Sequence, residues 1–353
     1  MNGPMTRALL AVGLALAVAF ALMCAISAEP VQALRQLLTG ALPEPHWSAD
    51  TGWTLRRLTR FGAVIEKTIT LTLLGLAVMF GFRARQFSIG ADGQFFLSAL
   101  AAVAVSVWLP PLGGLELLLA GAAAVAVGFV WGLLPGLLKA EFDANEIVTT
   151  LMLNVVAVQA FRYIVTHGFN DPAAGFLVTP TVPAGATLAA IVPRTQISAF
   201  VLAVPLATLA AAWLLRRTTL GYEIRVVGDA PAFARQAGLP VKRAVALSMA
   251  LGGAFAGLAG LHASNALLHR LPADLQPGIG FEGLVVALLA RNQPAAVPVA
   301  ALLYAFLEAG AQAMERSTDV SREMVLVIQA LIVLFVVAER LWPAGWVRRK
   351  AAI

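Results

Sequence analysis

Residues 216–243 read RRTTLGYEIRVVGDAPAFARQAGLPVKR and form a long polar stretch between two strongly apolar segments. Six of these residues are basic and two are acidic. The stretch contains signals for a short helix, in which Asp229 caps the N-terminus and Pro231 occupies the first turn. Gly238 then ends the helix, and Pro240 prevents it from resuming. A short capped helix between two membrane segments, on their basic side, is suited to docking a soluble partner.

The composition surrounding this stretch is that of a membrane protein. Of the 353 residues, 59% are hydrophobic and only 12% are charged, and the mean hydropathy is +0.82. A soluble domain of this size could not bury so much apolar surface, so we predict a polytopic all-α membrane protein. The net charge of +6 sits mostly at the ends of apolar runs, which indicates membrane orientation and not nucleic-acid binding.

We predict about ten transmembrane helices, whose ends are accurate to a few residues. The first is expected to be retained and not cleaved as a signal peptide. The charge of 216–243 places this loop in the cytoplasm, and alternation then puts both termini inside. The predicted segments are 7–27, 62–82, 93–109, 115–138, 146–166, 196–215, 244–264, 277–291, 295–315 and 323–342.

Two of these segments have unusual starts. Residues 83–94, RARQFSIGADGQ, place Gly, Asp and Gln where the third segment begins. The eighth segment is short and opens with Pro277, Gly278 and Gly280. Non-helical backbone at membrane depth survives only where it is buried in protein or lines a cavity. The two breaks therefore predict a substrate path near the midplane, between inverted repeats at 62–166 and 244–342 within one transmembrane domain, 1–353.

Four blocks of sequence, in order, resemble the permease subunits of ABC importers, and most closely the nucleoside and simple-sugar branch. The blocks span about 230 residues, and Ser88, Asp92 and Ala290 replace the family's usual Asn, Glu and Gly. The blocks are LTLLGLAVMFGFRARQFSIGADGQ (71–94), NEIVTTLMLN (145–154), GYEIRVVGDAPAFARQAG (221–238) and GIGFEGLVVALLARNQP (278–294).

The resemblance implies a BtuC-like fold of the type II importers and a set of partners. These are a cytoplasmic ABC ATPase dimer, a second permease subunit (the same or homologous) and an external substrate-binding lipoprotein, all at a bacterial inner membrane. The chain has no GxxxxGK[ST] motif, so any ATP would be hydrolysed by another polypeptide and the chain itself needs no cofactor. The histidines lie far apart, without the spacing of a metal site.

Transport requires polar groups that hold a solute weakly, so ionisable and amide side chains in apolar segments are candidates. For Gln94 and Asn154, solute contact and bonding between helices remain open alternatives. Glu146 either caps the fifth segment or gates the inner exit. The predicted path residues are Phe87, Ser88, Asp92, Gln94, Glu146, Asn154, Glu282 and Asn292.

The predicted coupling residues lie in the 216–243 stretch. Arg225 and Arg235 could pair with the ATPase, and Phe233 with Ala237 gives the helix one apolar face. The alternative is an amphipathic helix resting on membrane lipid. The coupling set is Arg225, Gly228, Asp229, Phe233, Arg235 and Gly238.

These features predict an ATP-driven importer permease, not an enzyme, for nucleosides first. The alternatives are simple sugars such as ribose or galactose, then branched-chain amino acids. An ion-coupled secondary transporter is a further alternative, and a membrane enzyme ranks last because no Ser/His or His/Asp cluster is evident.

Overall fold

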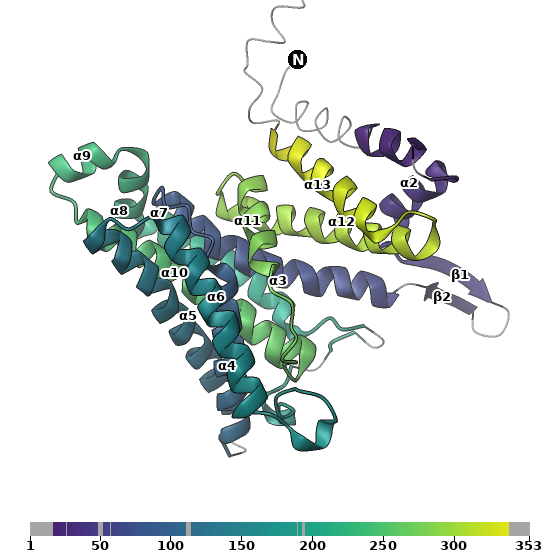
Figure 1. Cartoon of the computed structure of the whole chain (residues 1–353), viewed down its shortest axis with the longest axis horizontal. Coiled ribbons are helices and arrows are strands. Elements are labelled where there is room, and N and C mark those ends of the chain that lie inside the picture. Colours follow the sequence, from purple (N-terminus) through teal and green to yellow (C-terminus); the bar gives the residue numbers. More distant parts are fainter. Residues whose placement is uncertain are drawn as a thin grey trace, which may run out of the picture. The chain divides into compact units, whose positions relative to one another are not determined.

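The computed structural model describes residues 17–25, 27–48, 52–56, 58–110, 114–188, 190–192 and 195–338 (Figure 1). The chain forms two compact units. One contains residues 65–302, and the other contains 1–64 together with 303–353. Two helices, α3 (Leu58–Arg83) and α12 (Val297–Ser317), begin in one unit and continue into the other.

The 65–302 unit is a bundle of long helices. After α3 come α4 (Ala91–Trp108), α5 (Leu115–Phe142) and α6 (Glu146–His167). An irregular stretch with short 3-10 turns leads to α7 (Ala203–Arg217). The polar stretch forms α8 (Thr219–Asp229) and α9 (Pro231–Gln236), which lies at one end of the bundle in Figure 1. The unit continues with α10 (Val241–Leu261), the π-helical segment η4 (His262–Leu268) and the short α11 (Ile279–Leu289).

Glycines on α10 let this helix approach two neighbours closely. A Cβ at Gly253 would lie 1.9 Å from the carbonyl oxygen of Gly128 on α5, and one at Gly257 would lie 2.4 Å from that of Ala124. On another face, a Cβ at Gly252 would lie 2.5 Å from the carbonyl oxygen of Ala77 on α3. The GxxxG pair Gly253/Gly257 is thus a packing feature, and it makes α10 the centre of the bundle.

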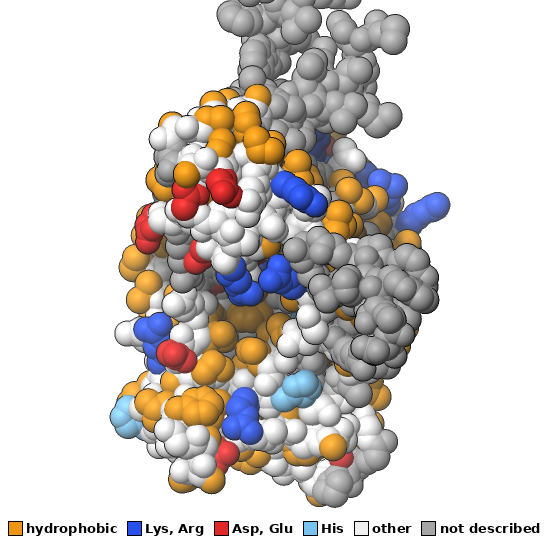
Figure 2. Space-filling view, turned by 90° about the vertical axis from the view of Figure 1, so that its right-hand side faces the viewer, with side chains coloured by type: hydrophobic (Ala, Val, Ile, Leu, Met, Phe, Trp, Pro, Cys, Tyr) orange, Lys and Arg blue, Asp and Glu red, His pale blue; other side chains and the backbone are white. Residues whose placement is uncertain are grey.

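The helices of this unit divide into central and peripheral ones. Helices α3, α4 and α10 are mostly buried, whereas α5, α6 and the 199–217 helix expose most of their apolar spans. Figure 2 shows hydrophobic side chains in several patches on one face of the protein, between charged and other side chains. Apolar helices that stay exposed in an isolated chain are suited to lipid or to another apolar subunit.

The other unit is smaller. It contains a helical stretch at 17–25, α2 (Pro30–Thr39), a hairpin of β1 (Glu44–Ser48) and β2 (Gly52–Arg56), the end of α12, and α13 (Arg322–Ala338). Its core includes Met23, Leu37 and Met314. Asp319 joins two parts of the unit, because its carboxylate accepts hydrogen bonds from the Ser27 hydroxyl (2.5 Å) and the Ala28 amide (2.8 Å).

Seven helices among the described residues are long and apolar enough to cross a membrane, and they match seven of the ten predicted segments. The eighth predicted segment is only α11, whose 11 residues span about 16 Å, half of a bilayer core. Predicted segments 7–27 and 323–342 lie partly outside the described residues. The hairpin and the π-helical segment were not predicted. The count of ten transmembrane helices, the BtuC-like arrangement and the inverted repeats stay predictions.

Candidate functional site

The predicted break before α4 is a short irregular connection, residues 84–90. It turns sharply because Arg85 adopts a left-handed conformation (φ 59°) and the Gln86 amide bonds back to the carbonyl of Gly81. Ser88 is buried, whereas Phe87 is 41% exposed and stacks on Phe82 with ring centroids 5.0 Å apart. The break is therefore an ordered feature and not a loose loop.

Asn154 of α6 holds this break in place. Its side-chain oxygen accepts a bond from the Gly93 amide (2.9 Å), and its side-chain nitrogen donates to the carbonyl of Ile89 (2.7 Å). Thr150, one turn earlier, accepts a bond from the Ile89 amide (3.2 Å). These bonds replace those that a continuous helix would have made, so Asn154 bonds between helices, and solute contact at this side chain stays a prediction.

Asp92 joins the two breaks. It lies in the first turn of α4, is 3% exposed, and its Oδ1 atom accepts bonds from the amides of Gly280 (2.7 Å) and Gly278 (3.2 Å). Those amides belong to the start of α11, where no side chain of its own N-cap residue satisfies them. The carboxylate of one broken helix thus caps the N-terminus of the other.

The rest of α11 is also fixed to α3. The Lys67 ammonium lies 2.6 Å from the Glu282 carboxylate in the first turn of α11. Beyond the other end of α11, Arg83 donates from Nε to the carbonyl of Asn292 (2.7 Å). Asn292 itself has a positive φ of 53°, and its side-chain oxygen is buried without a hydrogen-bond partner among the described residues. Glu282 thus forms an ion pair with another segment, and its predicted place on the solute path stays a prediction.

Gln94 faces a small cavity between α3, α4 and α10. The cavity is also lined by Ser88, Gly81 and Gly252, and it has room for about one water molecule. Gln94 is buried, and so is the nearby Ser98, whose hydroxyl has no partner among the described residues. The hydrogen-bonding side chains on this face of α4 are therefore neutral.

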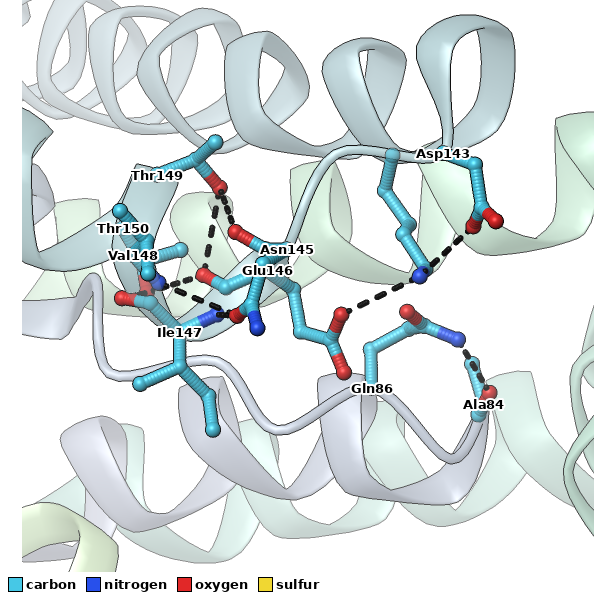
Figure 3. A network of polar contacts seen from close by, with 10 residues as sticks. Ala84, Gln86, Asp143, Asn145, Glu146, Ile147, Val148, Thr149 and Thr150 are labelled. Carbon is cyan, nitrogen blue, oxygen red and sulfur yellow. Dashed lines mark hydrogen bonds and ion pairs between the residues drawn. The ribbon is translucent and has the colours of Figure 1, made fainter.

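The turn from α5 to α6 contains an ion-paired cluster (Figure 3). The ammonium of Lys139 lies 2.8 Å from the Asp143 carboxylate and 3.3 Å from that of Glu146, and Gln86 of the break lies beside it. Asn145, and not Glu146, caps α6 by accepting bonds from the amides of Ile147 and Val148. The Lys139 ammonium lowers the pKa of Asp143 below its ordinary value.

The predicted coupling segment forms two helices instead of one. The prediction that Asp229 caps the short helix was wrong, because Asp229 is the last residue of α8 and Ala230 takes the N-cap position of α9. Residues 219–229 form a helix of their own, α8, which packs against α7 and α10 and ends at Asp229. Pro231 does begin α9, and Gly238, with φ 72°, ends it through bonds from its own amide to Arg235 and from the Leu239 amide to Ala234.

The coupling residues point in different directions. Phe233 is 58% exposed and Arg235 is also exposed, whereas Ala234 on the opposite side of α9 is buried. Gly228 lies against α3, where an added Cβ would be 2.0 Å from the carbonyl oxygen of Arg83. Arg225 stays on its own helix, where Nε donates to the carbonyl of Gly221 (3.4 Å).

A buried polar network was missed by sequence reasoning. His262 Nε2 lies 2.7 Å from a carboxylate oxygen of Glu66, and its Nδ1 lies 2.9 Å from the Thr70 hydroxyl. The other carboxylate oxygen of Glu66 accepts bonds from the amide (2.8 Å) and hydroxyl (3.3 Å) of Ser198. An ionisable residue inside an apolar helix was the available signal, but nothing in sequence linked Glu66 to a histidine nearly 200 positions away.

Comparison with known families identifies the family of this chain. Residues 61–337 match the family described as the branched-chain amino acid transport system permease component. The chain belongs to this family of ABC transporter permeases. It is accordingly a multi-pass membrane protein and a transport component, and the interpretations as an ion-coupled transporter or a membrane enzyme lose their support.

Several curated relatives cover most of the chain. A glucose ABC transporter permease of Haloferax volcanii is 33% identical, over 92% of this chain and 84% of the relative. A guanosine ABC transporter permease of Bacillus subtilis is 31% identical, over 86% of this chain and 88% of the relative. A nucleoside ABC transporter permease of Lactococcus lactis is 28% identical, over 78% of each chain. No solved structure matches the chain.

Proposed function

We propose that this chain is the permease subunit of an ATP-driven importer that carries nucleosides across a bacterial inner membrane. The observation that supports this most directly is the junction of two broken helices at Asp92, in a chain whose family consists of transport permeases. Permeases named for guanosine and for nucleosides are among its relatives. Neutral hydrogen-bonding groups near the junction, chiefly Gln94 and Ser88, suit a solute with hydroxyl and amide groups.

The junction also argues against an amino-acid solute. Where transporters bind a solute carboxylate, free amides at the start of a half-helix commonly receive it. Here those amides, of Gly278 and Gly280, are taken by the chain's own Asp92. A solute carboxylate would have to displace a buried carboxylate, which disfavours branched-chain amino acids despite the family's description.

Simple sugars are the second candidate. The relative at 33% identity is named as a glucose permease, and sugar hydroxyls need the same neutral donors and acceptors as a ribose. Path residues alone do not separate a sugar from a nucleoside.

The coupling to ATP hydrolysis is proposed to run through α8 and α9. The exposed face of α9, with Phe233 at its centre, would enter a groove of a cytoplasmic ATPase. Because Gly228 of α8 lies directly on the end of α3, a push on α9 would reach the 84–90 break and the Asp92 junction. A second permease subunit, an external binding lipoprotein and membrane lipid complete the assembly.

The test is uptake by the assembled transporter in liposomes. We expect labelled guanosine to accumulate only when the ATPase, ATP and the binding protein are all present. Phe233→Asp should lower uptake at least 10-fold, whereas Phe176→Asp, at a phenylalanine that is equally exposed but lies outside the coupling segment, should leave it unchanged. Accumulation by the purified chain alone, without nucleotide, would overturn the proposal.

The solute itself is best identified with the binding protein. Labelled guanosine, ribose, galactose and glucose can be compared for binding to it at equal concentration. Preference for guanosine supports the nucleoside proposal, and preference for any of the sugars replaces it with the second candidate.

A further inference from the structure

A cleft of about 820 Å³ opens beside α9 within the 65–302 unit. Its walls come from three places far apart in sequence: the 84–86 turn after α3, the end of α5 at 139–143, and the stretch from the end of α8 through α9 into α10. The lining contains five basic and two acidic side chains: Arg85, Lys139, Arg235, Lys242, Arg243, Glu141 and Asp143.

Two of the basic side chains are already paired. Lys139 binds Asp143 and Glu146, as Figure 3 shows, and Lys242 lies 2.7 Å from the Glu141 carboxylate. These pairs use both acidic residues of the lining.

Three arginines remain. Arg85, Arg235 and Arg243 form no ion pair within the part of the chain that the structure describes. The positive charge of Arg235 nevertheless contributes, after that of Lys139, to lowering the pKa of Asp143. The cleft therefore has an excess of positive charge that an anionic group from outside would balance.

The backbone fixes one of these arginines. Arg85 lies in the left-handed region, which a residue with a side chain adopts only under local constraint, and its amide bonds to the carbonyl of Phe82. Arg85 is thereby held at the mouth of the break that precedes α4. An anion bound at Arg85 would act directly on the connection that leads to Asp92.

Apolar side chains form the remainder of the lining. They come from Val227, Pro231, Leu239, Val241 and Val245. A free phosphate would gain nothing from these walls, whereas a peptide segment with a carboxylate next to an apolar side chain would use both parts of the cleft.

We propose that this cleft binds an acidic segment of the ATPase subunit, in which an Asp or Glu pairs with Arg85 and Arg243 and an apolar neighbour packs against Leu239. This rests on the proposed function, since it presumes an ATPase partner. The contact differs from that of the exposed Phe233 face of α9, because Pro231 and Arg235 of α9 line the cleft and Phe233 does not. The interface is then reciprocal: the permease inserts α9 and receives an acidic element beside it.

Charge reversal tests the cleft in the assembled transporter. Arg85→Glu combined with Arg243→Glu should reduce ATPase retention at 150 mM salt at least 10-fold, which is on the order of one broken charge pair at an interface. The residual retention should no longer depend on the salt concentration. Arg35→Glu, on an exposed arginine of α2 that lies outside the 216–243 stretch and does not line the cleft, is the matched control and should behave as wild type. The milder substitution Arg243→Gln removes one charge and should disturb the fold little. We expect it to lower ATPase retention by a smaller factor than the double variant.

The outcomes separate the two proposals. If the wild-type chain retains no ATPase, the proposed function fails. If the wild type retains ATPase and the double variant retains as much, only the cleft proposal fails.

A photo-crosslinking side chain at position 239 identifies the occupant directly. We expect crosslinks to a peptide of the ATPase that contains Asp or Glu. Crosslinks only to phosphatidylglycerol in mixed vesicles would show a lipid-headgroup site instead, and crosslinks to an ATPase peptide without acidic residues would also overturn the proposal.

Discussion

Removing the Asp92 carboxylate should release the start of α11 without unfolding the bundle. The Oδ1 atom of Asp92 accepts two backbone hydrogen bonds, of 2.7 Å from Gly280 and 3.2 Å from Gly278. In Asp92→Ala both amides lose their acceptor while the surroundings stay buried. In Asp92→Asn an amide oxygen remains and only the charge is lost.

The magnitude follows from the bonds. A hydrogen bond to a charged group contributes about 1.5–3 kcal/mol, and the longer of the two lies at the weak end. Because the first turn of α11 can shift after the change, we expect Asp92→Ala to cost about 2–3 kcal/mol in local stability. That free energy corresponds to a ~30- to ~150-fold increase in local opening. Asp92→Asn should cost about 1 kcal/mol, or ~5-fold.

Hydrogen exchange read by mass spectrometry measures this opening in the purified transporter. Peptides that cover 278–283 should exchange faster by these factors, whereas peptides from α5 should not change. The matched control is Asp274→Ala, because Asp274 is exposed and lies only four residues before Gly278. Unchanged exchange at 278–283 in a folded Asp92→Ala protein would refute the capping argument, and with it the proposed junction.

Three further predictions follow from other parts of the chain. Gly253→Ala should lower stability by about 1–3 kcal/mol, because its new methyl group would meet the carbonyl of Gly128, and a thermal melt should show a lower Tm than for Gly168→Ala, whose nearest neighbour is 3.6 Å away. Asn154→Ala should cost about 1–3 kcal/mol, because the Gly93 amide and the Ile89 carbonyl both lose their partner, and Asn154→Asp should cost at least as much, because its carboxylate would face the Ile89 carbonyl; protease sensitivity at 84–90 measures the difference. The bonds from Ser27 and Ala28 lower the pKa of Asp319, so its stabilising effect is present above the ordinary aspartate pKa of ~4 and is lost as pH falls through the lower folded-state value. Asp319→Asn should abolish this acid-dependent part, as melts between about pH 3 and 6 would show, and an unchanged pH profile would contradict the assignment.

The sequence predicted helices well where apolar length alone decides. Seven predicted segments coincide with helices to within a few residues, because nothing but a helix satisfies the backbone over twenty apolar positions. The sequence-based prediction failed where packing against other helices determines where a helix begins or ends. Asp229 has the chemistry of an N-cap, but packing of 219–229 against α7 and α10 continues α8 through it. Likewise, no sequence periodicity predicts the π-helical segment that begins at His262, whose side chain contacts Glu66 and Thr70.

For the site, the glycine and proline pattern located both breaks but could not show that they meet. Asp92 and Gly280 are 188 positions apart, and only the fold brings them to 2.7 Å. The predicted path residues thereby divide. Asp92 and Asn154 hold backbone, Glu282 and Glu146 form ion pairs, and Gln94 keeps a buried polar side chain beside a small cavity. Solute contact stays a prediction for all of them.

The arrangement of α11 explains how a push at one end could open a path elsewhere. This helix has three attachments within its unit: Asp92 at its start, Lys67 in its first turn, and Arg83 just beyond its end. Two of these come from α3 and the third from the first turn of α4, which the 84–90 break connects to α3. Because Gly228 of α8 rests on the carbonyl of Arg83, we expect a displacement of α8 to move the end of α3 and to act first on the attachment made by Arg83. A short helix held by polar contacts can shift as a body where a long apolar span packed by glycines cannot, so α11, and not α10, is where we expect the alternating step of transport to occur.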